Sequence, residues 1–260
     1  MNDFFTPPKV GRRAFKVWQR DRDAWYKFYK PSLIGNIAEP VLFLLAFGFG
    51  LSKYITDVGG MPYINFIAPG IVISSAMNAA SFECAFGSFT RMSAQKTYDA
   101  IIVTPVNIEE VAAGDIMWGA TKGFISAMII LPILVLFGLI ESPWLVLSPL
   151  LFALAGLMFA SMALIVTAFA PSYDFYAYYF SLVVSPMFFF SGIFFPLDTM
   201  PEWVSRAAWF MPLTHAVNVS RALSTGDVSL SHLGDVLWML VFTVAASWVA
   251  IKFIRRRLVK

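Results

Sequence analysis

The sequence predicts an all-α integral membrane protein with six transmembrane helices and both termini in the cytoplasm. Of its 260 residues, 58% are hydrophobic and 13% are charged, whereas a soluble domain carries about 25% charged residues. The mean hydropathy is +0.71. Six runs are long enough to cross a bilayer, which takes roughly 17–25 mostly apolar residues. Lys and Arg gather on one side of these runs, as they do in cytoplasmic loops.

The six runs follow one another without a linker that would separate domains, so a single membrane domain should occupy residues 1–260. Acidic residues interrupt the first three runs, whereas the fourth and fifth carry no charge. The runs are Leu33–Leu51, Tyr63–Phe89, Val111–Ile140, Trp144–Ala170, Phe175–Phe195 and Leu233–Ile254.

The orientation follows from the basic residues. Eight precede the first span, five come at or after the end of the last, and two lie between the second and third, so fifteen face the cytoplasm. Only Lys53, Arg206 and Arg221 face the other side. Because both basic ends belong in the cytoplasm, the number of spans is even. The segment Trp203–Leu223 is therefore no seventh span and belongs to an extracytoplasmic insertion, residues 196–226.

Two short helices are predicted within this insertion. Thr199 and Glu202 have the spacing of a capping box, and Pro201 suits a first helical turn. Pro212 separates this helix from a second one that ends before Gly226. Each half has about ten residues, or ~15 Å, which is half of the bilayer core. Such helices either rest on the outer leaflet or re-enter the membrane.

Residues 11–30 form an amphipathic segment ahead of the first span. Phe15, Trp18, Trp25 and Tyr29 lie near one helical stripe, and basic residues crowd the rest. This pattern is typical of a helix that lies in the interface of the cytoplasmic leaflet. The simpler interpretation is a positively charged anchor.

Four charged residues in the spans form a candidate polar cluster. A charge near the bilayer centre costs about 2.5–3.5 kcal/mol, so it usually faces the protein interior and has a partner. Asp115 and Lys122 share a face of the third span with Trp118. Glu39 and Glu83 are the candidate partners of Lys122. The cluster is either a structural set of ion pairs or a cytoplasmic vestibule whose pairs exchange during a transport cycle.

The fifth span begins with a cluster of aromatic residues on one helical face. Tyr176 and Phe180 share it with Tyr173, and Tyr179 adds to the aromatic density. Aromatic faces suit sugar rings or acyl chains in a translocation path, with the hydroxyls as polar contacts. The alternative is an interfacial belt, which Tyr and Trp often form in membrane proteins and which suits Tyr173 and Tyr176 better.

The sequence lacks the motifs of common enzymes. It contains no G-x-x-x-x-G-K-[ST] run for a nucleotide, no G-x-S-x-G elbow and no H-E-x-x-H helix. One cysteine and two histidines cannot build a typical structural zinc site. Basic residues cluster at the two ends instead of in a nucleic-acid-binding patch. We therefore expect no catalytic residue, metal or bound cofactor in this chain, and no nucleic-acid partner.

The cytoplasmic loop of residues 91–110 contains a short amphipathic stretch, Thr97–Val103, which Pro105 ends. A helix between spans is one means by which a soluble motor grips a membrane subunit. Many loops contain a helix for other reasons, so the residues alone leave this role open.

Three segments together resemble the ABC-2 type exporter permeases. They are "YINFIAPGIVISSAMNAASFECAFGSFTRM", "TYDAIIVTPVNIEEVAAGDIMW" and "TAFAPSYDFYAYYFSLVVSPMFFFSGIFFPLDTMPEWVSRAAWFMPLTHAVNVSR". The most specific parts are the Thr104-Pro105 loop, "APSYD" and the "SG-x-FFP" approach to the insertion. The resemblance runs from about Trp25 to the basic tail. Within these permeases, the chain is similar to the bacterial nodulation-factor and lipooligosaccharide export permeases.

The resemblance implies a multi-pass half-transporter in the bacterial inner membrane. Such permeases pair with a second copy of themselves, with membrane lipid and with two cytoplasmic ATP-binding cassette subunits, which bind the ATP and Mg²⁺. The exported substrate would be a lipid-linked or amphiphilic oligosaccharide, and the alternative is a hydrophobic drug or antibiotic. A protein of another class, an ATP-independent channel, enzyme or scaffold, would function without an ATPase.

The resemblance also implies roles for particular residues. The coupling helix seated on the ATPase would comprise Tyr98, Asp99, Ile102, Thr104 and Pro105. A second cytoplasmic contact would be the turn of Ser172, Tyr173 and Asp174. Residues 11–30 would be a gate helix, with Phe15, Trp18 and Trp25. Spans one, two and five would line the path, with Tyr176, Tyr179 and Phe180. The insertion would be a re-entrant hairpin and outer gate, with Glu202, Trp203, Arg206 and His215.

Overall fold

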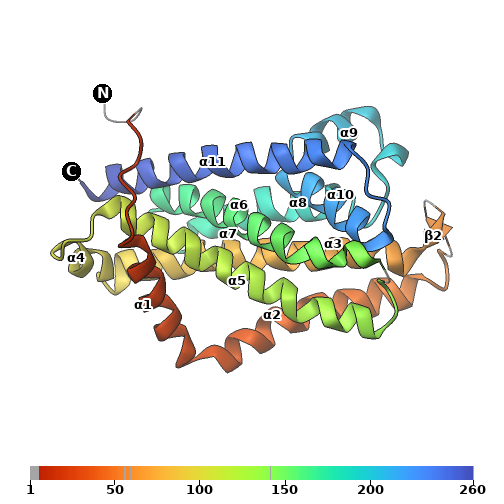
Figure 1. The fold of residues 1–260 in the computed structure, drawn as a ribbon, viewed down its shortest axis with the longest axis horizontal. Coiled ribbons are helices and arrows are strands. Elements are labelled where there is room, and N and C mark those ends of the chain that lie inside the picture. Colours follow the sequence, from red (N-terminus) through yellow and green to blue (C-terminus); the bar gives the residue numbers. More distant parts are fainter. Residues whose placement is uncertain (1–5, 56, 59, 141, 260) are drawn as a thin grey trace.

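The computed structural model describes residues 6–55, 57, 58, 60–140 and 142–259, with the backbone alone at 31–34, 36 and 37. These residues form a bundle of helices along one long axis (Figure 1). Within them, four helices are long and apolar enough to span a membrane: Tyr63–Ala94, Ile108–Leu136, Pro143–Phe169 and Ser231–Leu258. Two shorter apolar helices are Ala38–Leu51 and Phe175–Phe190. The helical membrane class predicted from the sequence is confirmed.

The helices coincide with the six apolar runs, with ends that differ by a few residues. The first run overlaps α2 (Tyr29–Phe43), which begins before it and continues as the π-helix Leu44–Leu51. The second contains α3 (Tyr63–Phe82), which continues through π-helical turns at Glu83–Gly87 and Thr90–Ala94. The third and sixth are α5 (Ile108–Leu136) and α11 (Ser231–Leu258). The fourth is α6 (Ser148–Phe169), behind a 3₁₀ turn at Pro143–Leu147. The fifth joins α7 (Phe175–Tyr179), the π-helix Phe180–Val184 and α8 (Ser185–Phe190).

Two of these ends change the interpretation of the sequence. The α3 helix passes the predicted end at Phe89 and reaches Ala94, so Arg91 is a helical residue instead of a loop residue. The fifth run stops at Phe190, before the predicted Phe195. The chain turns there at Gly192, whose φ of +78° favours glycine. A short antiparallel pair, β1 (Asp57–Val58) and β2 (Met61–Pro62), was not predicted.

The two ends of the bundle carry different elements (Figure 1). One end, called the α4 end below, holds α1 (Ala14–Tyr26), α4 (Thr97–Ile102) and both described ends of the chain. The opposite end, called the hairpin end, holds β2, α9 (Glu202–Trp209) and α10 (Pro212–Thr225). The chain therefore begins and ends at the same end of the bundle, as an even number of spans requires.

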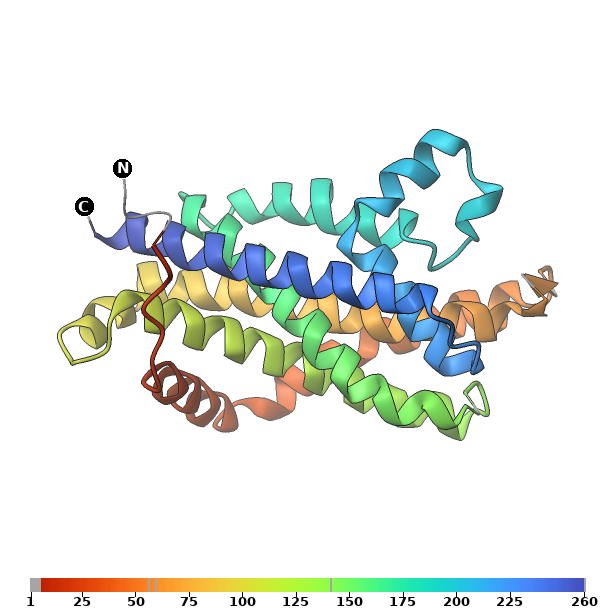
Figure 2. The ribbon, with the colours of Figure 1, turned by 45° about the horizontal axis from the view of Figure 1, so that its top comes forward.

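The hairpin end contains the two short helices that the sequence predicts. In Figure 2, α9 stands away from the bundle, whereas α10 packs along it and contacts α3 and α11. The predicted capping box is wrong. The Thr199 hydroxyl donates to the carbonyl of Pro196 at 2.7 Å, and α9 begins at Glu202 without a side-chain cap. A 3₁₀ turn at Leu197–Thr199 holds Thr199 away from the first turn of α9.

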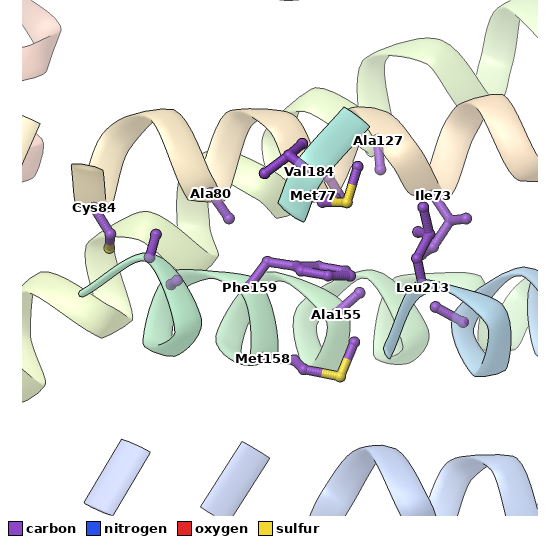
Figure 3. Packing of buried hydrophobic residues seen from close by; sticks show 14 of the residues in the cluster. Ile73, Met77, Ala80, Cys84, Ala127, Ala155, Met158, Phe159, Val184 and Leu213 are labelled. Atoms are coloured by element: carbon purple, nitrogen blue, oxygen red, sulfur yellow. The ribbon is translucent and has the colours of Figure 1, made fainter. Parts of the chain in front are cut away.

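Small residues bring α3, α5 and α6 close together. Figure 3 shows Ala80 of the α3 helix opposite Phe159 of α6. A Cβ on Gly156 would lie 2.6 Å from the carbonyl oxygen of Ala120. Helices in membranes associate largely through such close backbone contacts, because lipid provides no hydrophobic force between them.

Gly156→Ala is expected to lower the free energy of unfolding by about 1–3 kcal/mol, because the added methyl group meets the backbone of α5. Gly234→Ala on α11 is the matched control, since a Cβ there meets no atom within 4 Å. It should be neutral or raise helix stability by up to about 1 kcal/mol. Thermal unfolding of both purified variants in detergent measures the difference, and equal melting temperatures would contradict the close packing.

Candidate functional site

A buried ion cluster lies at the α4 end and is centred on Arg91 of the α3 helix. The Arg91 guanidinium donates to Glu83 Oε1 at 2.7 Å and to Asp115 Oδ2 of α5 at 3.1 Å. It also donates to Ser88 Oγ at 3.1 Å. Asp21 of α1 faces the same guanidinium, with Oδ1 3.9 Å from Nε. Arg91, Asp21 and Asp115 are 8%, 3% and 0% exposed, so this cluster is shielded from solvent.

The sequence of the α3 helix builds the Glu83–Arg91 pair. These residues are eight apart, so they lie near the same helical face two turns away from each other. Gly87 lies between them. A Cβ on Gly87 would lie 2.5 Å from Glu83 Oε1 and 3.4 Å from Arg91 Nη1. A side chain at position 87 would therefore displace the Glu83 carboxylate from its place beside Arg91.

Tyr98 joins α4 to this cluster. Its hydroxyl donates to Asp115 Oδ2, the same oxygen that accepts from Arg91, and its side chain is fully buried. Burial and the charge of Asp115 raise the pKa of Tyr98 well above its ordinary value, so the hydroxyl keeps its proton and donates. A helix as short as α4 is marginal in water on its own. The buried phenol is thus a principal attachment of α4 to the bundle.

α1 crosses α5 at Gly114. A Cβ on Gly114 would lie 2.6 Å from Val17 Cβ and 2.9 Å from the carbonyl oxygen of Ala14. The buried residues of α1 are Ala14, Val17 and Asp21, which have the spacing of one helical face. This close contact brings the carboxylate of Asp21 to Arg91.

The predicted aromatic stripe of α1 flanks that face and does not form its centre. Trp18 Nε1 donates to Thr121 Oγ1 of α5 at 2.9 Å. The Trp25 ring packs edge-on against Trp118, with 5.8 Å between centroids. Phe15 is 46% exposed. Small residues and Asp21 therefore dock α1, because only they allow the approach at Gly114.

The segment before α1 is hydrogen-bonded to the loop that connects α4 to α5 and to the start of α5. Arg13 Nη1 donates to the carbonyl of Pro105 at 2.5 Å. The backbone N–H of Gly11 donates to Glu110 Oε1 at 3.1 Å. Glu110 also closes a capping box with Asn107 at the start of α5. The start of α5 and the segment before α1 are thereby fixed to each other.

Glu109 links α5 to α11 at the same end. Its carboxylate accepts from Lys252 Nζ at 3.0 Å and from Arg255 Nη1 at 2.9 Å. The backbone N–H of Lys9 donates to it as well. Glu109 is 3% exposed, so sequence reasoning that treats it as a loop acid misses a buried ion pair.

The predicted coupling residues divide into an attached group and an outward-facing group. Tyr98 and the Pro105 carbonyl bond to the rest of the chain. Asp99 and Thr104 are exposed, and Ile102 is half-buried. α4 therefore offers an outer face to a partner while its inner face contacts the ion cluster.

The predicted second contact lies beside the same end of the α3 helix. The Tyr173 hydroxyl is 2.8 Å from Thr90 Oγ1. Its ring packs edge-on against Phe89, with 4.9 Å between centroids. Ser172 and Asp174 are exposed.

The predicted four-residue polar cluster is centred on a fifth residue, Arg91. Asp115 and Glu83 both accept hydrogen bonds from it. The Lys122 ammonium lies 5.3 Å from the centroid of the Trp25 ring and interacts electrostatically with Glu83, its predicted partner. Glu39 borders a cavity of about 300 Å³ between α2, α3 and α5, and its pairing with Lys122 stays a prediction.

Sequence reasoning misses Arg91 because it counts the residue among cytoplasmic loop charges. Two features of the sequence could have identified Arg91. Glu83, Gly87 and Arg91 are spaced four residues apart, and an intramembrane Asp115 needs a cation as its partner. Asp21 is harder to find, since its neighbours Arg20 and Arg22 suggest an exposed charged face.

Comparison with known proteins decides the family. The sequence profile of the ABC-2 type transporter family matches residues 13–224. The chain belongs to the ABC-2 type transporter family. Nodulation protein J of Rhizobium meliloti (strain 1021) is 36% identical over 96% of each chain, and nodulation protein J of Rhizobium leguminosarum bv. viciae is 35% identical over 98% of each. The inner membrane transport permease YadH of Escherichia coli (strain K12) is 23% identical over 92% of this chain and 93% of its own.

Family membership makes the chain a multi-pass membrane permease, a transport subunit without catalytic activity. Both statements agree with the predictions from the sequence. The resemblance to ABC-2 type permeases is confirmed over most of the chain.

The aromatic residues predicted to line a path pack inside the permease chain. The Tyr176 hydroxyl donates to Thr167 Oγ1 at 3.0 Å, and the Tyr179 hydroxyl is 3.3 Å from Ser81 Oγ. Both tyrosines are buried and Phe180 is half-buried. In this structure they hold helices together, and their place in a path stays a prediction.

His215 is the one buried residue among the four predicted outer-gate residues. Its Nδ1 is 2.6 Å from Asp235 Oδ1 of α11, and its Nε2 is 2.8 Å from the carbonyl of Trp209. The Trp238 ring stacks on it with 4.2 Å between centroids. These contacts hold the hairpin against α11. The other three residues are exposed on α9: Glu202, Trp203 and Arg206.

Arg221 is a second attachment of the hairpin that sequence reasoning misses. Its guanidinium donates to the carbonyls of Phe66 at 3.3 Å and Gly192 at 2.6 Å. It also lies 3.8 Å from the centroid of the Phe66 ring, which is a cation–π distance. α10 is thereby fixed to the start of α3 and to the turn after α8.

The stability of the permease is expected to fall as the pH rises from 6 to 8, because of Asp21. Burial and the charge of Asp115 raise the pKa of Asp21 from 3.8 to about 8. Between these values the folded state holds a proton that the unfolded chain has lost, so the free energy of unfolding falls by up to about 1.4 kcal/mol per pH unit. The contribution is complete below pH 3.8 and lost once the pH passes 8.

Asp21→Asn imitates the protonated side chain and should flatten this dependence. This expectation can be tested by measuring the melting temperatures of the wild-type permease and the variant in detergent from pH 6 to 9. The wild-type curve should fall more steeply and cross below that of the variant. Parallel curves would contradict a proton held on Asp21.

Proposed function

We propose that the permease is the membrane half of an ATP-driven exporter, a homodimer driven by two cytoplasmic ATP-binding cassette subunits. Six spans cross the bacterial inner membrane, with Ala38–Leu51 and Phe175–Phe190 as the first and fifth. The α4 end faces the cytoplasm, since the basic ends of the chain lie there. ATP and Mg²⁺ bind to the partner subunits. The name of the Escherichia coli relative, an inner membrane transport permease, supports this location.

The observation that carries the proposal is a continuous set of contacts from α4 into the bundle. Tyr98 of α4 bonds to Asp115 of α5, and Asp115 bonds to Arg91 of the α3 helix. Arg91 in turn faces Asp21 of α1. A force on the outer face of α4 therefore reaches α5, α3 and α1 through buried polar contacts, as coupling through a packed network requires.

The cargo in this proposal is a lipid-linked or amphiphilic oligosaccharide. Identity of about 35% with nodulation protein J over nearly the whole chain supports it, together with the resemblance to nodulation-factor exporters. The cavity of about 300 Å³ between α2, α3 and α5 adds polar groups, Glu39, Ser75 and Asn78, next to apolar helix faces. Sugar hydroxyls require polar partners of this kind, and acyl chains suit the apolar helix faces.

The second copy would pack on the exposed apolar faces of the spans predicted to line the path. Leu42 of α2, Phe49 of the following π-helix and Phe189 of α8 are 63%, 46% and 50% exposed. Exposed apolar side chains of this kind face either lipid or a neighbouring protein in a membrane. Placing the partner there positions the path between protomers.

Reconstitution tests the proposal. The permease should co-purify with a P-loop subunit under gentle detergent conditions, and inside-out vesicles containing both should take up a fluorescent lipooligosaccharide only with ATP. Uptake of a hydrophobic dye instead would favour the drug-exporter branch. Failure of any P-loop subunit to associate would overturn the exporter assignment.

A further inference from the structure

A cavity of about 410 Å³ lies between α1 and the end of the α3 helix, next to the ion cluster. Its volume falls within the range of ligand pockets, ≈ 300–1,000 Å³. Gln95 and Arg20 lie at its border, and Gln95 is exposed at the α4 end. The residues that matter for recognition are Asp21, Trp25, Glu83, Phe86, Arg91 and Trp118.

Two residues that line this cavity have unmet hydrogen-bonding capacity. Within the described residues, Trp25 Nε1 and Arg91 Nε have no hydrogen-bond partner. Arg91 is more than nine-tenths buried. Buried polar groups without partners are costly and rare in native proteins. Two N–H donors among the lining residues suit a ligand that carries hydroxyl or amide groups.

Aromatic rings supply the apolar part of the wall. Trp25 and Trp118 meet edge-on, at an interplanar angle of 62°, and Phe86 faces the same cavity. An indole offers a flat apolar face together with an N–H donor at its edge. A sugar ring has the matching chemistry, because its C–H groups lie on its faces and its hydroxyl groups at its edge.

The charge around the cavity disfavours an organic cation. Arg20 and Arg91 are positive, and the Lys122 ammonium lies 5.3 Å from the centroid of the Trp25 ring, whereas Glu83 and Asp115 are negative. Burial and the charge of Asp115 raise the pKa of Asp21 to about 8, which leaves Asp21 uncharged at pH 7. Because three cations face two carboxylates, an organic cation gains nothing from these charges.

We propose that this cavity binds a neutral sugar ring of the exported glycan before translocation. The inference rests on the proposed function, because only a glycan cargo brings such a ring to the permease. A ring in the cavity would contact Asp21 and Arg91, which Asp115 connects to Tyr98 of α4. Loading of cargo and contact with the ATPase thus share one cluster of side chains.

Direct binding to the full-length permease in nanodiscs tests the site without any transport step. The probe is the neutral glycan tetra-N-acetylchitotetraose, measured by equilibrium dialysis. Trp25→Ala should weaken its binding about tenfold or more. Trp144→Ala is the matched control, since Trp144 is 47% exposed and belongs to the 3₁₀ turn Pro143–Leu147, which contacts α10, and it should bind the glycan as the wild type does.

A second measurement covers the case in which Trp25→Ala does not fold. The single native cysteine, Cys84, is fully buried, so Gln95→Cys introduces an accessible thiol at the border of the cavity. Tetra-N-acetylchitotetraose should slow the reaction of this thiol with a maleimide severalfold. Ala94→Cys, at an exposed neighbouring position outside the cavity wall, should react at an unchanged rate.

Each outcome decides the inference. Weaker glycan binding in Trp25→Ala, or selective protection at position 95, supports it. Equal glycan binding in Trp25→Ala and Trp144→Ala overturns the site, and ATP-driven uptake of the lipooligosaccharide in vesicles would show separately that the exporter assignment survives. Binding of tetraphenylphosphonium or inorganic phosphate at this cavity in place of the glycan also overturns it. If neither binding nor protection occurs, the cavity is not a glycan site.

Discussion

Arg91→Met is expected to lower the free energy of unfolding of the permease by about 3–5 kcal/mol, because removing one partner of a buried ion set leaves uncompensated charge. Glu83 and Asp115 would both lose the guanidinium that now donates to them at 2.7 and 3.1 Å. Domains are typically stable by only about 5–15 kcal/mol. The yield and melting temperature of the purified variant should therefore fall sharply.

Arg221→Met is the matched control for this prediction. The two arginines are both largely buried, but Arg221 donates to the backbone carbonyls of Phe66 and Gly192. Its loss removes charged hydrogen bonds worth about 1.5–3 kcal/mol without stranding a carboxylate. Adding Asp115→Asn to Arg91→Met should recover part of the stability, which a double-mutant cycle measures. Equal losses for the two arginines, with no recovery, would contradict the ion cluster.

The spans were predictable because the bilayer imposes a length and a composition on each of them. α5, α6 and α11 lie within a few residues of the apolar runs that predict them. α4 was also predictable, since Thr97–Val103 is a short amphipathic stretch ended by Pro105, and the helix occupies Thr97–Ile102. In each case the signal is local, so the residues of the element itself are sufficient.

The ion cluster was not predictable to the same degree, because it depends on contacts between elements. Hydropathy places the end of the second span near Phe89, yet the helix continues through π-helical turns to Ala94 and carries Arg91 into the bundle. Which face of α1 docks depends on Gly114 of α5, where the two backbones approach. The amphipathic pattern of α1 favours its aromatic residues and contains no information on that approach.

Tyr98→Phe is expected to reduce ATP-driven export by about 10- to 100-fold while the partner ATPase continues to hydrolyse ATP. The ring stays in its buried place, so α4 still folds and binds its partner. The variant loses one hydrogen bond to a charged group, worth about 1.5–3 kcal/mol, and a coupling free energy of that size corresponds to such a factor. Transport and hydrolysis measured in the same proteoliposomes give the ratio of substrate moved to ATP consumed.

Tyr54→Phe is the matched control, since Tyr54 is 87% exposed and lies between the π-helix Leu44–Leu51 and β1. It should export as the wild type does. The comparison separates two roles of Tyr98, because a purely structural residue would lower transport and ATP hydrolysis together. A ratio of transport to hydrolysis that is unchanged in Tyr98→Phe would mean that force passes from α4 by another route. One other contact is the bond from Arg13 to the carbonyl of Pro105, which connects the loop after α4 to the start of α1 without the buried carboxylates.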